Sequence, residues 1–165
     1  TALKYRLKGF QYFDEPGLEN TRITSADDSD LDAIKAALSN GEVLTYSTYI
    51  ASWKTTRIQP DPAAPENQKY AGEEIVITQN GYEGGHRMAL VGYNDNIWID
   101  INKNYKVDDG EMGAFKIADS WGDGWGNKGF MWIAYDALNE ISCVDGVDQI
   151  LVRKYAKGSA DQSAK

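Results

Sequence analysis

The sequence predicts an α+β fold, in which a β-rich, antiparallel, barrel-like sheet carries one packed helix. Residues 31–38 have apolar side chains at helical spacing, and this is the one clear helix of the chain. Short segments rich in Val, Ile, Thr and Tyr follow one another along the rest of the sequence. The turns between them are too short for crossover helices, so we expect neighbouring strands to pair antiparallel.

The predicted helix has signals at both ends. Leu31, Ile34 and Leu38 recur on one face, with alanines between them, and acidic residues precede them. Negative charge near the first turn is stabilised by the positive end of the helix dipole. Asn40-Gly41 then predicts the end of the helix, because glycine tolerates the left-handed backbone that ends many helices.

The strands are predicted from β-branched and aromatic residues and from period-two alternation. Residues 4–10 alternate charged and apolar side chains, which is typical of a half-buried strand. A proline-rich stretch at 59–67 predicts a surface loop. The other expected strands are 42–50, 75–78, one that His86 opens, 97–101, 114–118, 130–135 and 149–155.

Composition fits one domain at residues 1–157, followed by a small polar segment at 158–165 that we expect to be a disordered linker or tail. The formal net charge is -8, whereas nucleic-acid binding needs clustered Lys and Arg to neutralise phosphates. We therefore expect no nucleic-acid partner and no anionic membrane surface. No apolar run of the sequence approaches the roughly 20 residues that span a bilayer.

Two separate segments carry the residues best suited to proton chemistry. His86, the single histidine, opens an apolar strand, and Asp119 ends a later strand. A general base needs one ring nitrogen free and the other fixed by a hydrogen bond, which a carboxylate supplies. Trp121 follows Asp119 closely enough to cover the pair from water. We therefore predict that His86 and Asp119 form a base and its orienting partner.

These segments resemble the histidine and asparagine segments of papain-like cysteine peptidases. His-x-x-x-x-Val-Gly-Tyr at 86–93 and Ser-Trp-Gly-x-Gly-Trp-Gly-x-x-Gly-Phe at 120–130 carry the resemblance. It implies the right-hand (barrel) subdomain of that family, with His86 as the catalytic base, Asp119 at the asparagine position and Trp121 as the shielding indole. It also implies that Gly85 and Arg87 line the substrate cleft.

Two of these residues depart from the family pattern. Asp119 replaces the usual asparagine, and its negative charge favours a protonated imidazole. It can still orient His86, or it can be part of a vestigial or half site. Arg87 occupies a position beside the histidine that is usually small, which argues against ordinary peptide recognition.

The larger departure is the nucleophile. The family carries its cysteine in a Gln-x-x-x-x-x-Cys-Trp type segment, and the sequence holds no such segment. The single cysteine, Cys143, has acidic neighbours and no preceding helix-start signal. A thiolate forms at neutral pH beside a helix N-terminus or a cation, so we interpret Cys143 as a small packed hydrophobe.

A second group of polar residues has the spacing of a calcium loop. Side-chain oxygens fall at positions 1, 3, 5, 9 and 12 of a twelve-residue loop that starts at residue 100. Tyr105 stands at position 6, where glycine normally makes the turn, and the alternative is a solvated hairpin tip. Ca2+ would be the one cofactor. The predicted ligands are Asp100, Asn102, Asn104, Lys106 through its carbonyl, Asp108 and Glu111.

Three functions fit these observations, and we favour the first. It is a papain-like module without its catalytic cysteine, a pseudoenzyme that serves as a non-catalytic binding or architectural module of a secreted, multimodular, cellulosome-associated bacterial protein. The second is the C-terminal half of an active cysteine endopeptidase whose helical, cysteine-bearing half lies upstream or on another chain. The third is a calcium-stabilised carbohydrate-binding or structural domain.

The favoured function predicts a chain that is inactive on its own and works outside the cell or at its surface. Its expected partners are an N-terminal papain-like helical half or a neighbouring module. A peptide or polysaccharide ligand also fits, with sugar contact by Trp53, Trp98 or Trp132 as one form of it.

Overall fold

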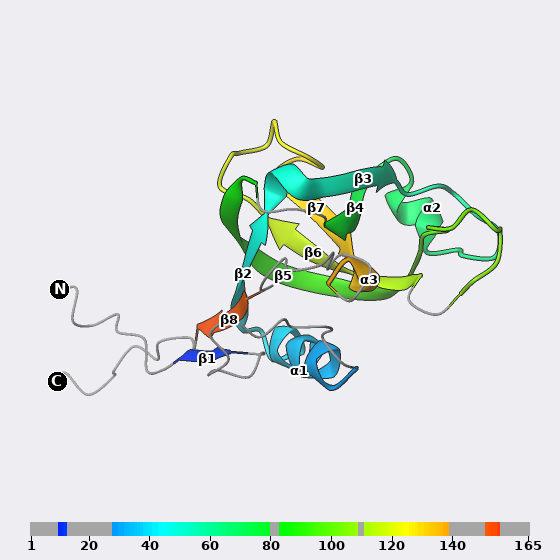
Figure 1. Ribbon diagram of the computed structural model, residues 1–165. Helices are drawn as coiled ribbons and strands as arrows, with labels where there is room; N and C mark the ends of the chain where they lie inside the picture. The colour runs from blue at the N-terminus through cyan, green and yellow to red at the C-terminus, as the bar shows by residue number, and fades with distance from the viewer. Residues whose placement is uncertain (1–9, 13–27, 80–82, 109–110, 139–150, 156–165) are drawn as a thin grey trace, which may run out of the picture.

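The computed structural model describes residues 10–12, 28–79, 83–108, 111–138 and 151–155 (Figure 1). The predicted strand at 4–10 is described at its last residue alone, and both Cys143 and the predicted tail lie outside the described residues. The helices are α1 (Asp28–Ser39), α2 (Asn67–Tyr70) and α3 (Tyr135–Leu138). The strands are β1 (Phe10–Tyr12), β2 (Val43–Tyr49), β3 (Trp53–Arg57), β4 (Glu74–Gln79), β5 (Gly85–Trp98), β6 (Met112–Ala118), β7 (Phe130–Ala134) and β8 (Leu151–Tyr155).

Helix α1 confirms the predicted helix and its end. Leu31, Ile34 and Ala37 are buried, because they share the face that packs against β2 and β5. Gly41 has a φ of 73° and donates its N–H to the carbonyl of Leu38, while the next N–H reaches Ala37. This pair of bonds satisfies the last carbonyls of the helix in a Schellman motif. Among the described residues, no helix is long and apolar enough to span a membrane.

All eight strands belong to one sheet, with the order β1-β8-β2-β5-β6-β7-β4-β3. The fold class is confirmed, since the molecule is mainly sheet with one main helix. Figure 1 shows the sheet curling, with β3 along one side of the body and β5 along the other. Within the described residues the sheet does not close, because β1 and β3 remain as its two edges.

One strand pair differs from the antiparallel expectation. Strands β4 and β7 pair parallel, with Ile75 opposite Trp132 and Val76 opposite Ile133. The rule of short connections applies to strands adjacent in sequence, whereas β5 and β6 lie between these two and supply a long connection. The other pairs are antiparallel, so the sheet is mixed.

Several element boundaries also differ from the sequence prediction. The two strands expected at His86 and at 97–101 are one strand, β5, whose register with β6 shifts between Leu90 and Gly92 and again before Trp98. Such shifts bend a long strand so that it can follow a curled sheet. Tyr135 begins α3 instead of ending β7. Strand β3 and helix α2 were not expected, because both segments are short and mainly polar and neither shows a clear apolar periodicity.

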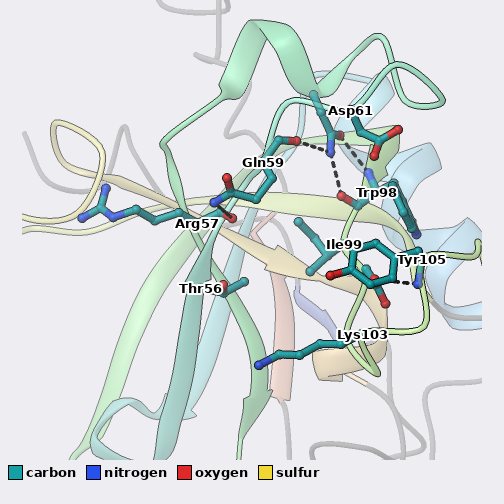
Figure 2. Close-up of a pocket in the computed structure, with 10 residues that line it drawn as sticks. Thr56, Arg57, Gln59, Asp61, Trp98, Ile99, Lys103 and Tyr105 are labelled. Atoms are coloured by element: carbon teal, nitrogen blue, oxygen red, sulfur yellow. Dashed lines mark hydrogen bonds between the residues drawn. The ribbon is translucent and has the colours of Figure 1, made fainter.

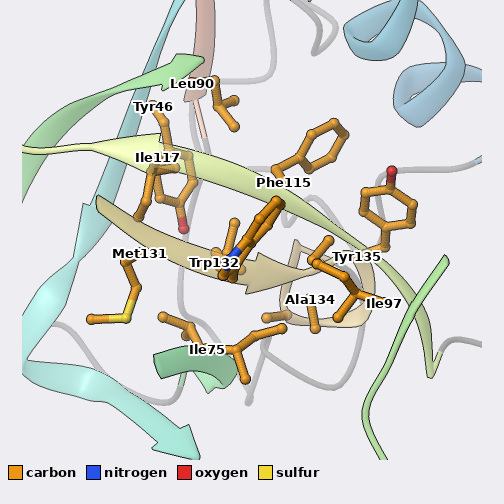
Figure 3. Close-up of a cluster of buried hydrophobic side chains, with 14 of the residues drawn as sticks. Tyr46, Ile75, Leu90, Ile97, Phe115, Ile117, Met131, Trp132, Ala134 and Tyr135 are labelled. Carbon is orange, nitrogen blue, oxygen red and sulfur yellow. The ribbon is translucent and has the colours of Figure 1, made fainter. Parts of the chain in front are cut away.

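The core lies inside the curl of the sheet (Figure 3). Tyr46, Leu90 and Ile117 come from β2, β5 and β6 and are fully buried. Each large apolar side chain removed from water contributes about 1.5–3 kcal/mol to stability. Because inward residues alternate with outward ones along β5 and β6, this core fixes which side chains face outward.

Candidate functional site

His86 and Asp119 meet because β5 and β6 are neighbours in the sheet. His86 is the second residue of β5, and Asp119 directly follows β6, whose last residue Ala118 pairs with Ala89. The imidazole Nε2 lies 2.9 Å from Asp119 Oδ2 and 3.1 Å from Oδ1. The side chain of Asp119 is fully buried and that of His86 is 19% exposed. The structure therefore brings the predicted pair into direct contact.

The contact with Asp119 assigns different roles to the two ring nitrogens. An ionised carboxylate only accepts hydrogen bonds, so the Nε2 nitrogen is the one that carries a proton toward it. The other nitrogen, Nδ1, makes no hydrogen bond to any of the described residues. In the neutral ring Nδ1 therefore holds the free lone pair. This atom can accept and return a proton, which is the task of a general base.

The carboxylate of Asp119 is itself held in place. The backbone N–H of Ser120 donates to its Oδ1 at 2.5 Å, and the Ser120 hydroxyl lies 3.4 Å from the same oxygen. The backbone N–H of Asp119 donates to the carbonyl of Gly129 at 3.1 Å, which closes the loop after β6. These bonds fix the carboxylate on a rigid turn, so it can orient the imidazole.

Trp121 covers one face of the imidazole. The two rings stack with centroids 4.6 Å apart and planes 25° apart, and Trp125 packs edge-on against Trp121 at 6.0 Å. Trp121 is 57% exposed, so its outer face meets solvent while its inner face meets His86. The indole keeps water from one side of the base, which is the arrangement that the sequence predicted.

A comparison with models of protein families gives the family of the chain. A model of the family described as "Papain family cysteine protease" matches residues 30–147 of the chain.

The chain belongs to the papain family.

Solved structures that match the chain include digestive procathepsin L2 proteinase from Tenebrio molitor larval midgut, with 17% identity and a TM-score of 0.41 over 92% of this chain and 35% of that one. Two crystal structures of the proform of Amb a 11, a cysteine protease and major ragweed pollen allergen, also match. One has 18% identity and a TM-score of 0.42 over 90% of this chain and 33% of that one. The other has 14% identity and a TM-score of 0.45 over 94% and 35%. The chain thus spans about a third of the length of these structures. A search of curated proteins finds no match.

The loop that carries the papain-family tryptophans depends on a residue that sequence reasoning missed. Asn127 accepts the backbone N–H of Glu74 at 2.7 Å and donates to the carbonyl of Glu74 at 2.9 Å. It thereby ties the loop to the start of β4. Gly126 has a φ of 52°, and an added Cβ would lie 2.5 Å from the carbonyl of Phe130, so glycine is required there. An asparagine directly after Gly126 and two residues before Gly129 was the available signal.

The two cleft residues implied by the papain resemblance lie beside His86 on β5. Gly85 pairs with Tyr49, and Arg87 is exposed and pairs with Ser47. Because successive side chains of a strand point to opposite faces, Arg87 projects from the face opposite to that of His86. Their contact with a substrate stays a prediction.

The tryptophans expected to contact sugar lie largely inside this papain-family fold. Trp98 and Trp132 are buried, and their indole N–H groups donate to Glu111 at 3.3 Å and to Glu73 at 2.7 Å. Trp53 donates to Thr48 at 2.8 Å. Trp98 also lines a cavity, and sugar contact by these tryptophans stays a prediction.

The predicted calcium loop adopts a compact turn of hydrogen bonds. Asp100 accepts the backbone N–H groups of Asn104 at 3.0 Å and Tyr105 at 2.9 Å. Tyr105 has a φ of 60°, so position 6 makes the left-handed turn without a glycine. Glu111 is buried, and its Oε1 accepts the N–H of Ile101 at 2.8 Å. The backbone therefore makes a compact left-handed turn at this position.

The side chains of this loop bond to one another. The amides of Asn102 and Asn104 donate to Asp108 Oδ2 at 2.6 Å and 2.5 Å, and these bonds hold the pKa of the Asp108 carboxyl below its usual range. Among the described residues, which omit 109–110, no group of three or more His, Cys, Asp or Glu side chains could hold a metal ion. Calcium binding by this loop stays a prediction.

Proposed function

We propose that this chain is a papain-family module that lacks its catalytic cysteine and serves as a non-catalytic binding or architectural module of a secreted, multimodular bacterial protein. The observation that carries the proposal is a base without a nucleophile. His86 and Asp119 are in contact at 2.9 Å, whereas the sequence holds one cysteine and no Gln-x-x-x-x-x-Cys-Trp segment. An extracellular or cell-surface location is part of the proposal.

The chemistry of a cysteine peptidase explains why this pair alone is insufficient. General-base help contributes roughly two to four powers of ten to a rate when a nucleophile is present, and it contributes nothing without one. Cys143 lies between Glu140 and Asp145 in the sequence, and negative neighbours oppose the thiolate that the reaction needs. We therefore assign the His86 pair to architecture or recognition in this chain.

A second candidate is the base-carrying half of a working cysteine endopeptidase. The orientation of His86 favours it, because Nδ1 is the atom left open for a partner group. The opposite face of the sheet offers a separate apolar surface. On this face Ala89, Ala118 and Phe130 stand in register across β5, β6 and β7. Phe130 is 37% exposed and Val91 on the same side of β5 is 47% exposed.

Exposed apolar side chains grouped in this way usually mark a surface for another protein or domain. Ala89 and Val91 lie on the face of β5 opposite to that of His86, so a helical, cysteine-bearing half would have to meet His86 from the other side of the strand. A neighbouring module of the same protein would cover the face without supplying a thiol. The two candidates therefore differ in whether a partner meets the face of His86 and carries a nucleophile there.

An activity assay tests the favoured proposal. Purified chain is incubated with fluorogenic peptidyl-coumarin substrates, and separately with a thiol-directed epoxide whose attachment is mapped by mass spectrometry. We expect no hydrolysis and no selective labelling of Cys143. Hydrolysis that disappears in His86→Ala would overturn the proposal, and so would epoxide labelling of Cys143 that depends on His86.

The coding sequence upstream of Thr1 decides between the two candidates. A Gln-x-x-x-x-x-Cys-Trp segment encoded there supports the peptidase half, and serine or another residue at the cysteine position supports the non-catalytic module. Expression of the chain with that upstream region gives the functional test. Peptide hydrolysis by the longer protein and its loss in His86→Ala would establish the second candidate.

A further inference from the structure

A cavity of about 260 Å3 lies at the end of β5 that is far from His86, and Figure 2 shows the residues that line it. Trp98, the last residue of β5, lines it, whereas His86 is the second residue of the same strand. The stretch between them corresponds to roughly 40 Å of extended strand. The cavity shares no residue with the His86 pair, so it is a separate site. Its function does not depend on whether the His86 site is active.

The floor of the cavity is rigid, and the buried amide of Asn67 in it already has its hydrogen-bond partners. Asn67 is 1% exposed, and its Nδ2 donates to the carbonyls of Gln59 at 3.0 Å and Trp98 at 2.8 Å. Its Oδ1 accepts the N–H of Trp98 at 3.0 Å. Three hydrogen bonds from one buried amide join α2, the preceding loop and β5. Together with buried Ile99 they hold the floor in one shape, which lowers the entropy cost of binding.

An exposed aromatic ring forms one wall of the cavity. Tyr105 is 87% exposed, and its hydroxyl makes no hydrogen bond to the described residues. Its backbone has a φ of 60°, a conformation that costs energy for any residue except glycine. Asp100 holds this conformation by accepting the Tyr105 N–H at 2.9 Å. The chain thus maintains an exposed ring at a strained position, beside Ile99 in Figure 2.

Polar groups surround the space beside this ring. Thr56, Gln59 and Lys103 line the cavity, and Lys103 makes no ion pair within the described residues. Figure 2 shows the Arg57 side chain extending away from the other sticks, and its guanidinium pairs with Glu74 at 2.8 Å. The four charged residues of the lining are Arg57, Lys103, Asp61 and Asp100, so their formal charges cancel.

From these features we propose that the cavity binds the ring of a neutral sugar, as one unit of an oligosaccharide. The cavity is slightly smaller than the roughly 300–1,000 Å3 of pockets for drug-sized ligands, so it suits a single ring. A sugar has an apolar C–H face, which stacks on an exposed aromatic ring, and hydroxyl groups, which need both donors and acceptors. Tyr105 supplies the first, and Thr56 and Gln59 supply the second.

Other ligands of similar size fit the cavity less well. A phosphate or a sugar acid would gain from Lys103 but would meet Asp61 and Asp100. A cationic amine would meet the reverse arrangement. An aromatic peptide side chain could stack on Tyr105 but would leave the polar groups without partners, which lowers affinity. A neutral polyhydroxylated ring satisfies both kinds of surface.

The test is a titration of isotope-labelled chain followed by nuclear magnetic resonance. Neutral methyl glycosides of glucose, galactose, mannose and N-acetylglucosamine, and their disaccharides, are added in EDTA so that calcium does not vary. We expect saturable shifts of the Asn67 side-chain amide and the Trp98 indole N–H with at least one of them. Glucuronate, inorganic phosphate and N-acetyltyrosinamide should give no saturable shift.

Variants distinguish the ring from the loop that carries it. Tyr105→Gly removes the ring and also relieves the strained φ, so it should keep or raise the melting temperature while weakening sugar binding by about tenfold or more. Gln59→Ala, on another element, should weaken binding as well. Tyr105→Phe and Phe130→Ala, an exposed aromatic outside the cavity, should bind like the unaltered chain.

Three results would overturn the proposal. The first is the absence of a saturable shift with every neutral sugar. The second is a stronger response to glucuronate, phosphate or N-acetyltyrosinamide than to the neutral sugars, which would identify an anion or peptide site. The third is sugar binding that Tyr105→Gly and Gln59→Ala both leave unchanged.

Discussion

At the residue scale, Gly113 has the least room for a side chain among the described glycines. Its φ is 93°, and an added Cβ would lie 2.1 Å from Cε2 of Tyr135. Tyr135 cannot easily move, because it is buried, packs on Phe115 at 4.7 Å and donates to Asp95 at 2.8 Å. Burial and this bond raise the pKa of Tyr135 far above its ordinary value, so the phenol keeps its proton. The glycine therefore fixes the start of β6, which leads to Asp119.

We predict that Gly113→Ala lowers the free energy of unfolding by about 3 kcal/mol, because overpacking and a disfavoured φ act together. Gly72→Ala is the matched control. Gly72 has a φ of 87° and open space around its Cβ position, so only the backbone strain remains, about 1 kcal/mol. Urea denaturation at constant m-value measures both changes. Equal losses in the two variants would contradict the steric part of the argument.

At the element scale, the loop between β6 and β7 is held by the contacts of Asn127 with Glu74. Asn127→Ala removes two hydrogen bonds and leaves the N–H and carbonyl of Glu74 without these partners, so we expect a loss of about 1–3 kcal/mol. The stacking of Trp121 on His86 should loosen at the same time. Near-ultraviolet circular dichroism reports that change. Lys128→Ala in the same loop is a comparison that leaves the two bonds intact, and a dichroism signal unchanged in Asn127→Ala would refute the anchoring role.

The loop after β5 gives a prediction about calcium. The turn geometry of Asp100 and Tyr105 suits the ligand spacing, and the two asparagines lower the charge of the site, so affinity should fall in the weak, extracellular range of about 10⁻⁴–10⁻³ M. Calcium at ten times its dissociation constant would add about 1.4 kcal/mol to the free energy of unfolding. Melting scans with calcium or EDTA measure this. Asp100→Asn should reduce the shift, and flat curves at millimolar calcium would remove the prediction.

At the scale of the whole molecule, local patterns predicted the elements but not every pairing. Leu31, Ile34 and Leu38 predicted α1 because helical spacing is a local signal, and the papain-like motifs predicted that His86 and Asp119 would meet. The parallel pairing of β4 with β7 depends on how the whole sheet curls, which no short segment encodes. The cavity was not predicted either, since Asn67, Trp98 and Tyr105 come from separate parts of the sequence.

The outward face of β5, β6 and β7 gives the last prediction. Val91 is 47% exposed and Phe130 is 37% exposed, beside the small residues Ala89 and Ala118, so this face offers apolar surface to a partner. We expect the isolated chain to associate as its concentration rises, and Val91→Asp to reduce this association in analytical ultracentrifugation. Val107→Asp is the control, because Val107 is 55% exposed in the loop at the other end of the molecule. The charge change is the same in both variants, so a difference between them locates the surface through which the chain self-associates. If both variants stay as associated as the unaltered chain, or if the chain is monomeric throughout, this face needs no partner, and the case for a neighbouring module packed on it loses its structural support.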